Sequence, residues 1–135
     1  MSQNPNTRFS MLEVRSNPMQ KSVVPTYTTA AAITYSAADI ESGLIIRDTN
    51  GLARADLVPT AATLNTYFRN PEANMSMRFI IRNSSGAANA ITVTTNTGIT
   101  LSGTMSIAQL NSKEFKLVFT SNTAVTIYSL GTIVF

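Results

Sequence analysis

The chain has 135 residues, enough for one domain with a single core, and it contains no cysteine and no histidine. These absences exclude disulfides, thiolate nucleophiles, zinc–thiolate sites and catalytic triads built on histidine. Charged residues make up 13% of the chain, against roughly 25% in an average soluble domain. We therefore expect a protein that is not an enzyme, holds no metal or cofactor, and packs against other protein or carbohydrate.

The net charge of +3 is concentrated near the N-terminus, where Arg8, Arg15 and Lys21 are offset only by Glu13. Elsewhere the basic residues do not cluster with aromatic ones, as nucleic-acid-binding surfaces require, so we expect no nucleic-acid partner. The sequence has no apolar stretch that matches a secretory signal or the roughly 20 residues of a membrane span. We expect a protein that is made in a cytosol and is not exported by the general route, with no membrane partner and no small-molecule ligand.

Residues 1–30 are predicted to form an extended arm, because Pro5, Pro18 and Pro25 interrupt any regular element. Such a segment is disordered by itself unless something ties it down. A neighbouring subunit is the simplest candidate, and packing of the arm on its own domain is the alternative. The expected contacts are a small apolar cluster and the basic residues beside it: Phe9, Met11, Leu12, Val14, Arg8, Arg15 and Lys21.

Residues 31–135 are predicted to form one folded domain that carries one or two short helices. Ser36 has the position of an N-cap and Gly43 that of a C-cap around a single helical turn. Residues 59–68 place apolar side chains at positions i, i+3 and i+4, which predicts a two-turn helix that covers one end of the domain.

Apolar and polar residues alternate in short runs through the rest of this domain, a pattern typical of strands buried on one face. The predicted strands are residues 32–35, 44–46, 52–58, 76–82, 91–95, 99–101, 104–107, 115–119, 125–128 and 132–135. Residues 108–113 are expected to form a loop, and Phe115, Leu117 and Phe119 are expected to face the core. A strand spacing of about 8–12 residues predicts an all-β fold, either an antiparallel β-sandwich or a jelly-roll-like domain.

The dipeptide Asn50-Gly51 is the strongest short hairpin signal in the chain. It predicts that residues 44–46 and 52–58 pair as neighbouring antiparallel strands.

Four charged residues flank this turn: Arg47, Asp48, Arg54 and Asp56. The arginines could pair with either aspartate at the surface, where an ion pair is worth about 0–1 kcal/mol, or across a subunit boundary. Asp48 precedes Asn50 and is expected to be an Asx-turn residue. The alternative is a carboxylate site for Ca²⁺ formed with Asp39, Glu41 and Asp56, but the spacing does not match an EF-hand.

The hydroxyl-rich strands supply a second set of candidate contacts. Thr92 and Thr94 alternate with apolar residues on one strand, and Thr100 and Thr126 do so on others, so we expect these threonines at subunit or lattice interfaces. The four tyrosines, Tyr27, Tyr35, Tyr67 and Tyr128, would make a sugar-stacking platform if they were exposed together. The favoured interpretation places each at a sheet edge or interface with its hydroxyl satisfied.

The phrases GLIIRDTNG (residues 43–51), TGITLSGTMSIAQ (residues 97–109) and VTIYSLGT (residues 125–132) carry a resemblance. From about residue 30 to 135 the chain resembles small β-rich structural proteins of aquatic viruses and tailed phages. The resemblance implies a virion component without an active site: a minor capsid, cement, decoration or head-fibre protein, commonly a homotrimer, that binds the major capsid protein. It also implies that the protein is assembled into the virion in the host cytoplasm. The arm of residues 1–30 is not covered by it.

Two hypotheses of different class follow. The first is a capsid protein that oligomerises and anchors to the shell through its arm. The second is an adhesion or glycan-binding module at a particle surface. An enzyme ranks a distant third, because neither histidine nor cysteine is present.

Overall fold

The computed structural model describes residues 23–134. Its elements in chain order are β1 (Thr26–Tyr27), α2 (Ala37–Ser42), β2 (Leu44–Arg47), β3 (Arg54–Leu57), α3 (Ala61–Tyr67), β4 (Ser76–Asn83), β5 (Ile91–Thr94), β6 (Ile99–Ser102), β7 (Ser106–Ile107), β8 (Asn111–Phe119) and β9 (Val125–Val134). β1 falls inside the range assigned to the arm from sequence, and it pairs with β2.

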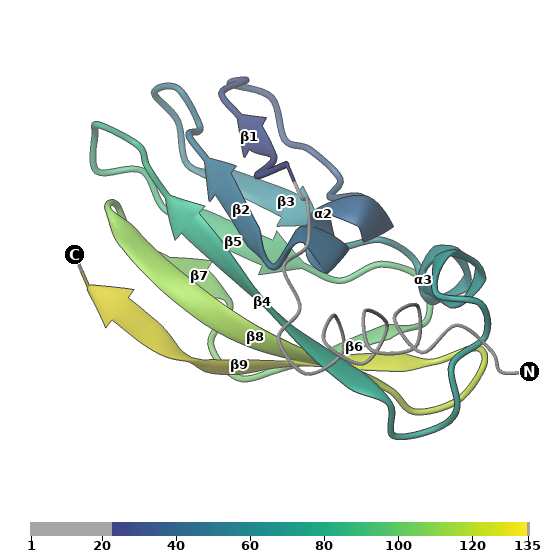
Figure 1. Ribbon diagram of the computed structural model, residues 1–135. Coiled ribbons are helices and arrows are strands. Elements are labelled where there is room, and N and C mark those ends of the chain that lie inside the picture. The colour runs from purple at the N-terminus through teal and green to yellow at the C-terminus, as the bar shows by residue number, and fades with distance from the viewer. Residues whose placement is uncertain (1–22, 135) are drawn as a thin grey trace, which may run out of the picture.

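The strands form two sheets (Figure 1). Six strands follow the order β1-β2-β4-β8-β9-β6, and three follow the order β3-β5-β7. The prediction of a mostly β fold with short helices is confirmed, but the prediction of antiparallel sheets is wrong. β1 with β2, β2 with β4, β6 with β9, and β3 with β5 are parallel pairs. Each parallel pair is separated along the chain by a long connection, which such pairing requires.

The core contains buried apolar side chains from both sheets and both helices. The larger sheet contributes Phe79 and Phe115, whose rings stack with centroids 5.2 Å apart, and the smaller sheet contributes Ile91 and Ile107. The predicted core positions of β8 are confirmed, because Phe115, Leu117 and Phe119 are all buried. The side chains of the smaller sheet therefore reach the same cluster as those of the larger one.

The first helix, α2, begins and ends where the sequence predicts, and the second, α3, lies within the predicted range of residues 59–68. Ser36 and Asp39 form a reciprocal capping box at the start of α2, and Gly43 ends that helix with φ of 82°. α3 starts at its N-cap Thr60, whose side chain accepts from the amide of Thr63. Figure 1 shows both helices at the same end of the sheets, so they cover that end of the core.

The predicted hairpin at Asn50-Gly51 is wrong, although the turn exists. Both residues have positive φ, 50° and 104°, as a tight turn requires. However, β2 lies in the six-stranded sheet and β3 in the three-stranded one. The turn therefore carries the chain from one sheet to the other and does not join neighbouring strands.

Three other boundaries differ from the sequence predictions. Residues 32–35 make only an isolated bridge, between Thr34 and Leu57. The predicted loop over residues 108–113 overlaps β8, which starts at Asn111. The last two predicted strands are one strand, β9, and its pairing with β8 shifts register between Glu114 and Phe115.

Lys113 explains the mistaken loop. Its side chain is buried, and its ammonium group donates a 2.8 Å hydrogen bond to the Thr104 carbonyl. Burial lowers the pKa of this lysine below its ordinary value. A charged residue on a core-facing position hides the alternation that would otherwise predict a strand.

Candidate functional site

A buried ion pair joins the two sheets. The Nε atom of Arg47, in β2, lies 2.7 Å from Oδ2 of Asp56, in β3, and its Nη2 lies 3.3 Å from Oδ1. Both side chains have an exposed fraction of 0%. The sequence named Asp56 as one candidate partner of the arginines, either at the surface or across a subunit boundary. The pairing of Arg47 with Asp56 is present, but the expected surface location is wrong, because the pair is buried and bridges two layers of the fold.

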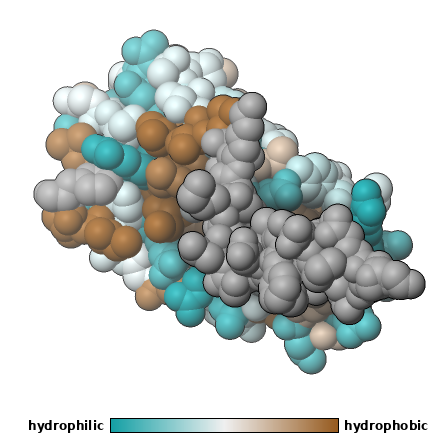
Figure 2. Space-filling model, viewed as in Figure 1, coloured by the Kyte–Doolittle hydropathy of each residue, from teal (hydrophilic) through white to brown (hydrophobic). Residues whose placement is uncertain are grey.

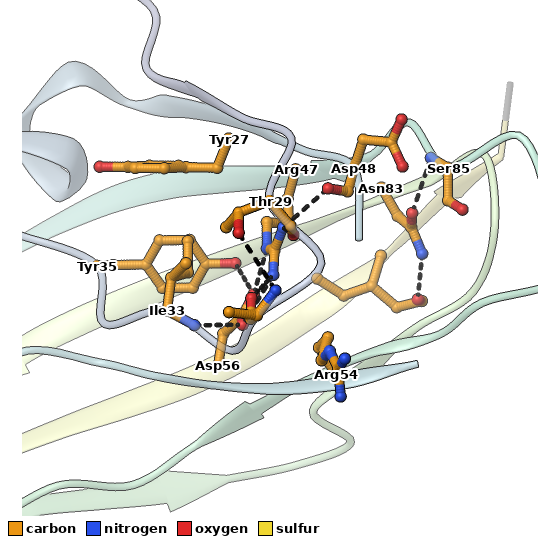
Figure 3. Close-up of polar contacts among 12 residues, drawn as sticks. Tyr27, Thr29, Ile33, Tyr35, Arg47, Asp48, Arg54, Asp56, Asn83 and Ser85 are labelled. Carbon is orange, nitrogen blue, oxygen red and sulfur yellow. Dashed lines mark hydrogen bonds and ion pairs between the residues drawn. The ribbon is translucent and has the colours of Figure 1, made fainter. Parts of the chain in front are cut away.

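The carboxylate of Asp56 has further partners. It accepts hydrogen bonds from the amide of Ile33, at 3.0 Å, and from the hydroxyl of Tyr35, at 2.9 Å (Figure 3). The Arg47 guanidinium also donates to backbone carbonyls outside the pair. A buried charge pair is tolerated when hydrogen bonds satisfy its remaining donors and acceptors, and this one meets that condition.

Arginine side chains hold three consecutive carbonyl groups of the segment before β2. Arg47 donates to the carbonyl of Thr29, at 2.7 Å, and to that of Ala31, at 2.8 Å. Between them, the Ala30 carbonyl accepts from Nε of Arg54. We call this arrangement of Arg47, Arg54 and the carbonyls of residues 29–31 the arginine clamp. It fixes the backbone at the boundary predicted between arm and domain.

Sequence reasoning singled out both arginines but missed the clamp. One signal was available, since Arg47 has the same strand parity as Ile45, which faces the core. A charged residue at a core-facing position indicates a buried partner. No sequence pattern indicates that the other hydrogen-bond acceptors of these arginines are backbone carbonyls near residue 30.

Of three other residues predicted to make inter-subunit contacts, two form hydrogen bonds within the chain and one is exposed. Asp48 is confirmed as an Asx-turn residue, because its carboxylate accepts from the amide of Asn50 at 2.8 Å. Thr94 donates to the backbone carbonyl of Asp56 at 2.9 Å, so it joins β5 to β3 inside the subunit. Thr92 is exposed, and its place at a subunit interface stays a prediction.

Thr100 is exposed and Thr126 is half-buried, each on the larger sheet. The predicted arm contacts lie outside the described residues: Arg8, Phe9, Met11, Leu12, Val14, Arg15 and Lys21.

The tyrosines do not gather into one platform. Tyr27 and Tyr35 pack edge to face with centroids 6.3 Å apart, and Tyr35 is buried. Tyr67 lies on α3 and donates to Glu41 of α2, whereas Tyr128 lies on β9. For three of the four, the expected satisfied hydroxyl is confirmed, through Asp39, Asp56 and Glu41.

The packing of Tyr27 and Tyr35 predicts alkaline sensitivity. Burial and a hydrogen bond to Asp39 raise the pKa of Tyr27 to about 12, and burial beside Asp56 raises the pKa of Tyr35 well above its usual value. Because an unfolded tyrosine ionises near pH 10, the stability these groups contribute is fully present below pH 10. It is lost as the pH rises through 12 and beyond.

Ultraviolet absorbance of tyrosinate measures this prediction. We expect Tyr27 and Tyr35 to ionise only well above pH 10 or on unfolding, and Tyr35→Phe to remove one late-ionising group. Ionisation of all four tyrosines near pH 10 in a chain that circular dichroism shows to be folded would contradict it.

The acidic residues are engaged individually. Asp39 caps α2, and Asp48 accepts the hydrogen bond of its Asx turn. Asp56 belongs to the buried ion pair, and Glu41 accepts a hydrogen bond from Tyr67. Over residues 23–134, no three histidine, cysteine or acidic side chains lie close enough together to hold a metal ion. The same part of the chain contains no helix with the length and apolar character needed to cross a bilayer.

The chain was compared with protein-family models, with curated proteins and with solved structures, and none of the three comparisons gave a match. The functional argument therefore depends on the residues and their geometry.

Proposed function

We propose that this protein is a structural component of a virion, a decoration, cement or minor capsid protein that oligomerises and is held to the shell by its N-terminal arm. The two packed sheets would serve as a variant of the β-sandwich, with mixed pairing in place of the antiparallel or jelly-roll pairing expected from sequence. Its partners would be the major capsid protein and further copies of itself, with a homotrimer as the expectation drawn from the family resemblance.

The observation that carries the proposal is the arginine clamp. An arm that binds a neighbouring subunit can hold its own domain in place only if the backbone between the arm and the domain stays bound to the domain. Arg47 and Arg54 fix the carbonyls of residues 29–31, and Arg47 is itself fixed by the buried Asp56. The junction is thus tied to both sheets, as an anchor point requires.

The composition of the surface supports the same proposal. Strands β5 and β6 expose Thr92, Thr100 and Ser102 where many soluble proteins carry charged residues. Hydroxyl side chains cost less to desolvate than charged ones, so such a surface suits burial against other subunits. Because this surface carries few charges, separate copies of the protein would repel one another only weakly.

The test is to separate virus particles from the source culture on a density gradient and to detect the chain with an antibody. We expect it in the capsid fraction, in a fixed ratio to the major capsid protein. A chain that stays in the soluble fraction while particles form would overturn the proposal.

A truncated chain tests the role of the arm. Removing residues 2–22 spares Pro25, whose carbonyl accepts from the Ile46 amide at 2.9 Å, and should leave the fold intact by circular dichroism. We expect the truncated chain to be lost from particles when supplied beside a tagged full-length chain. Equal incorporation of the two would remove the anchor from the proposal.

One observation favours the glycan-binding alternative. Beside Tyr67, the outer face of α3 carries an open hollow of about 420 Å³, lined by Ala62, Thr63, Thr66 and Tyr67. A half-exposed tyrosine with hydroxyl neighbours offers an apolar ring face and polar partners to a sugar ring. Glycan-array binding that Tyr67→Ala abolishes would favour this function over the structural one.

A further inference from the structure

Within the described residues, the second half of β9 has a free edge. β6 pairs with β9 only as far as Tyr128, and Gly103 then lies against Ser129 as the chain turns away to β7. A Cβ atom at position 103 would lie 3.1 Å from the Ser129 Cβ. The backbone at Gly103 is therefore still close to β9, and the chain turns away from β9 after this residue. Residues 131–134 pair with β8 on one side, and Leu130 is the extra residue where the pairing with β8 shifts register. No other strand of residues 23–134 lies on the other side of this segment.

This edge is apolar and uncharged. The exposed fractions of Leu130, Ile133 and Val134 are 44%, 50% and 74%, and Figure 2 shows hydrophobic surface around the C-terminal end of β9. Proteins usually protect edge strands with lysine, proline or inward-pointing charge, because free N–H and C=O groups pair with other strands. Residues 130–134 contain no charge and no proline. A β-bulge, which also protects edges, lies at Leu130, at the start of the segment, and leaves residues 131–134 in regular pairing with β8.

We propose that residues 130–134 pair with the same residues of a second copy, antiparallel about a two-fold axis. An identical strand is the occupant that the edge fits, because two uncharged copies do not repel and a two-fold contact closes on itself. The inference deepens the proposed function, on which it rests, by stating which surface joins two copies. It also predicts pairs, so a trimer would need a further interface.

The side chains select a register centred on Thr132. In that register Leu130 lies opposite Val134 of the partner subunit, and Ile133 lies opposite the partner's Gly131. The glycine has no side chain, so the isoleucine can pack over its backbone. The two Thr132 residues face each other, a favourable cross-strand pair. This register brings all three exposed apolar side chains into the contact.

The contact is too short to hold two isolated subunits tightly. Five residues from each copy bury much less than the roughly 1,200–2,000 Å² of a stable interface. In a shell, where the arm holds each subunit in place, the local concentration is high and a weak contact is occupied. We therefore expect reversible pairing in solution.

Disulfide trapping detects such pairing and reads its register. The natural chain has no cysteine, so Thr132→Cys introduces a single thiol. Opposed antiparallel residues have Cα atoms about 4.5–5.5 Å apart, within the range that a disulfide spans. At position 133 the two Cα atoms would be more than about 7 Å apart, too far to bridge without movement.

Mild oxidation should crosslink Thr132→Cys about tenfold faster than Leu52→Cys, because pairing raises the effective thiol concentration. Leu52 is a matched control, since it is 53% exposed in the loop between β2 and β3. Ile133→Cys should crosslink slowly as well. Equal rates at positions 52 and 132 would overturn the inference, and faster reaction at 133 than at 132 would overturn the register.

A charge on the edge gives a second measurement. Ile133→Lys should abolish concentration-dependent association in sedimentation experiments, while Leu52→Lys should leave it unchanged and both should stay folded by circular dichroism. Association unaffected by Ile133→Lys would overturn the edge contact. Because incorporation into particles is measured separately, a shell protein that pairs through another face would still satisfy the proposed function.

Discussion

Asp56→Asn is expected to lower the free energy of unfolding by about 3–5 kcal/mol, the cost of leaving one member of a buried ion pair without its partner. The reason is that Arg47 keeps its charge in an environment from which water is excluded, since both side chains are fully buried. The amide also replaces an oxygen that accepts from Tyr35 or Ile33 with a group that donates.

Chemical denaturation monitored by circular dichroism measures this loss. The chain supplies a matched control, because Glu114 pairs with Arg78 at 3.6 Å with side chains 32% and 61% exposed. Glu114→Gln should cost about 0–1 kcal/mol. A loss at Asp56 no larger than that at Glu114 would contradict the role assigned to the buried pair.

A double-mutant cycle separates the pair from its surroundings. Combining Asp56→Leu with Arg47→Met removes both charges, and replacing a buried pair by apolar residues is often close to neutral. We expect the double variant to be more stable than Asp56→Leu alone, although the carbonyls of residues 29 and 31 lose their donor. The arm junction should then be cut by a protease faster than in the natural chain.

Gly98→Ala is expected to lower the free energy of unfolding by about 2–4 kcal/mol, through backbone strain and overpacking together. Gly98 has φ of 79°, and a Cβ atom there would lie 2.6 Å from the Cβ of Ala61 and 2.8 Å from the carbonyl oxygen of Thr123. Ala61 starts α3 and Thr123 belongs to the turn before β9. Three segments of the chain meet at a point with no room for a methyl group.

Gly43→Ala separates the two causes. Gly43 has nearly the same φ, 82°, but apart from its own neighbours along the chain no atom of the described residues lies within 4 Å of the position of its Cβ. Its replacement should cost about 1 kcal/mol, the contribution of the backbone alone. Thermal unfolding of both variants measures the difference, and equal losses would show that packing at Gly98 contributes nothing.

The sequence predicted the elements whose determinants are local. The caps at Ser36 and Gly43 and the strand periodicity of Phe115, Leu117 and Phe119 appear where expected, because hydrogen bonds and periodicity within a few residues decide them. The turn at Asn50-Gly51 was also predicted, since positive φ favours those residue types.

The sequence did not predict which strands pair with one another or which sheet each strand joins. A local turn signal is the same whether the next strand pairs beside the previous one or crosses to another sheet. Here β3 belongs to the other sheet, so Asp56 contacts Arg47 from the facing sheet and not from a neighbouring strand of the same sheet. The clamp on residues 29–31 depends on that crossing, because only then can Arg47 reach both the aspartate and the carbonyls.

The sequence by itself determined that this chain is mostly β, sparsely charged and without histidine or cysteine, because composition and periodicity need no knowledge of the fold. Only the tertiary structure decided that the charged residues around the turn form a buried junction and that β9, among residues 23–134, ends as a free edge. Both depend on which strands become neighbours. That choice is made by long-range burial of apolar surface, which no short segment of sequence records.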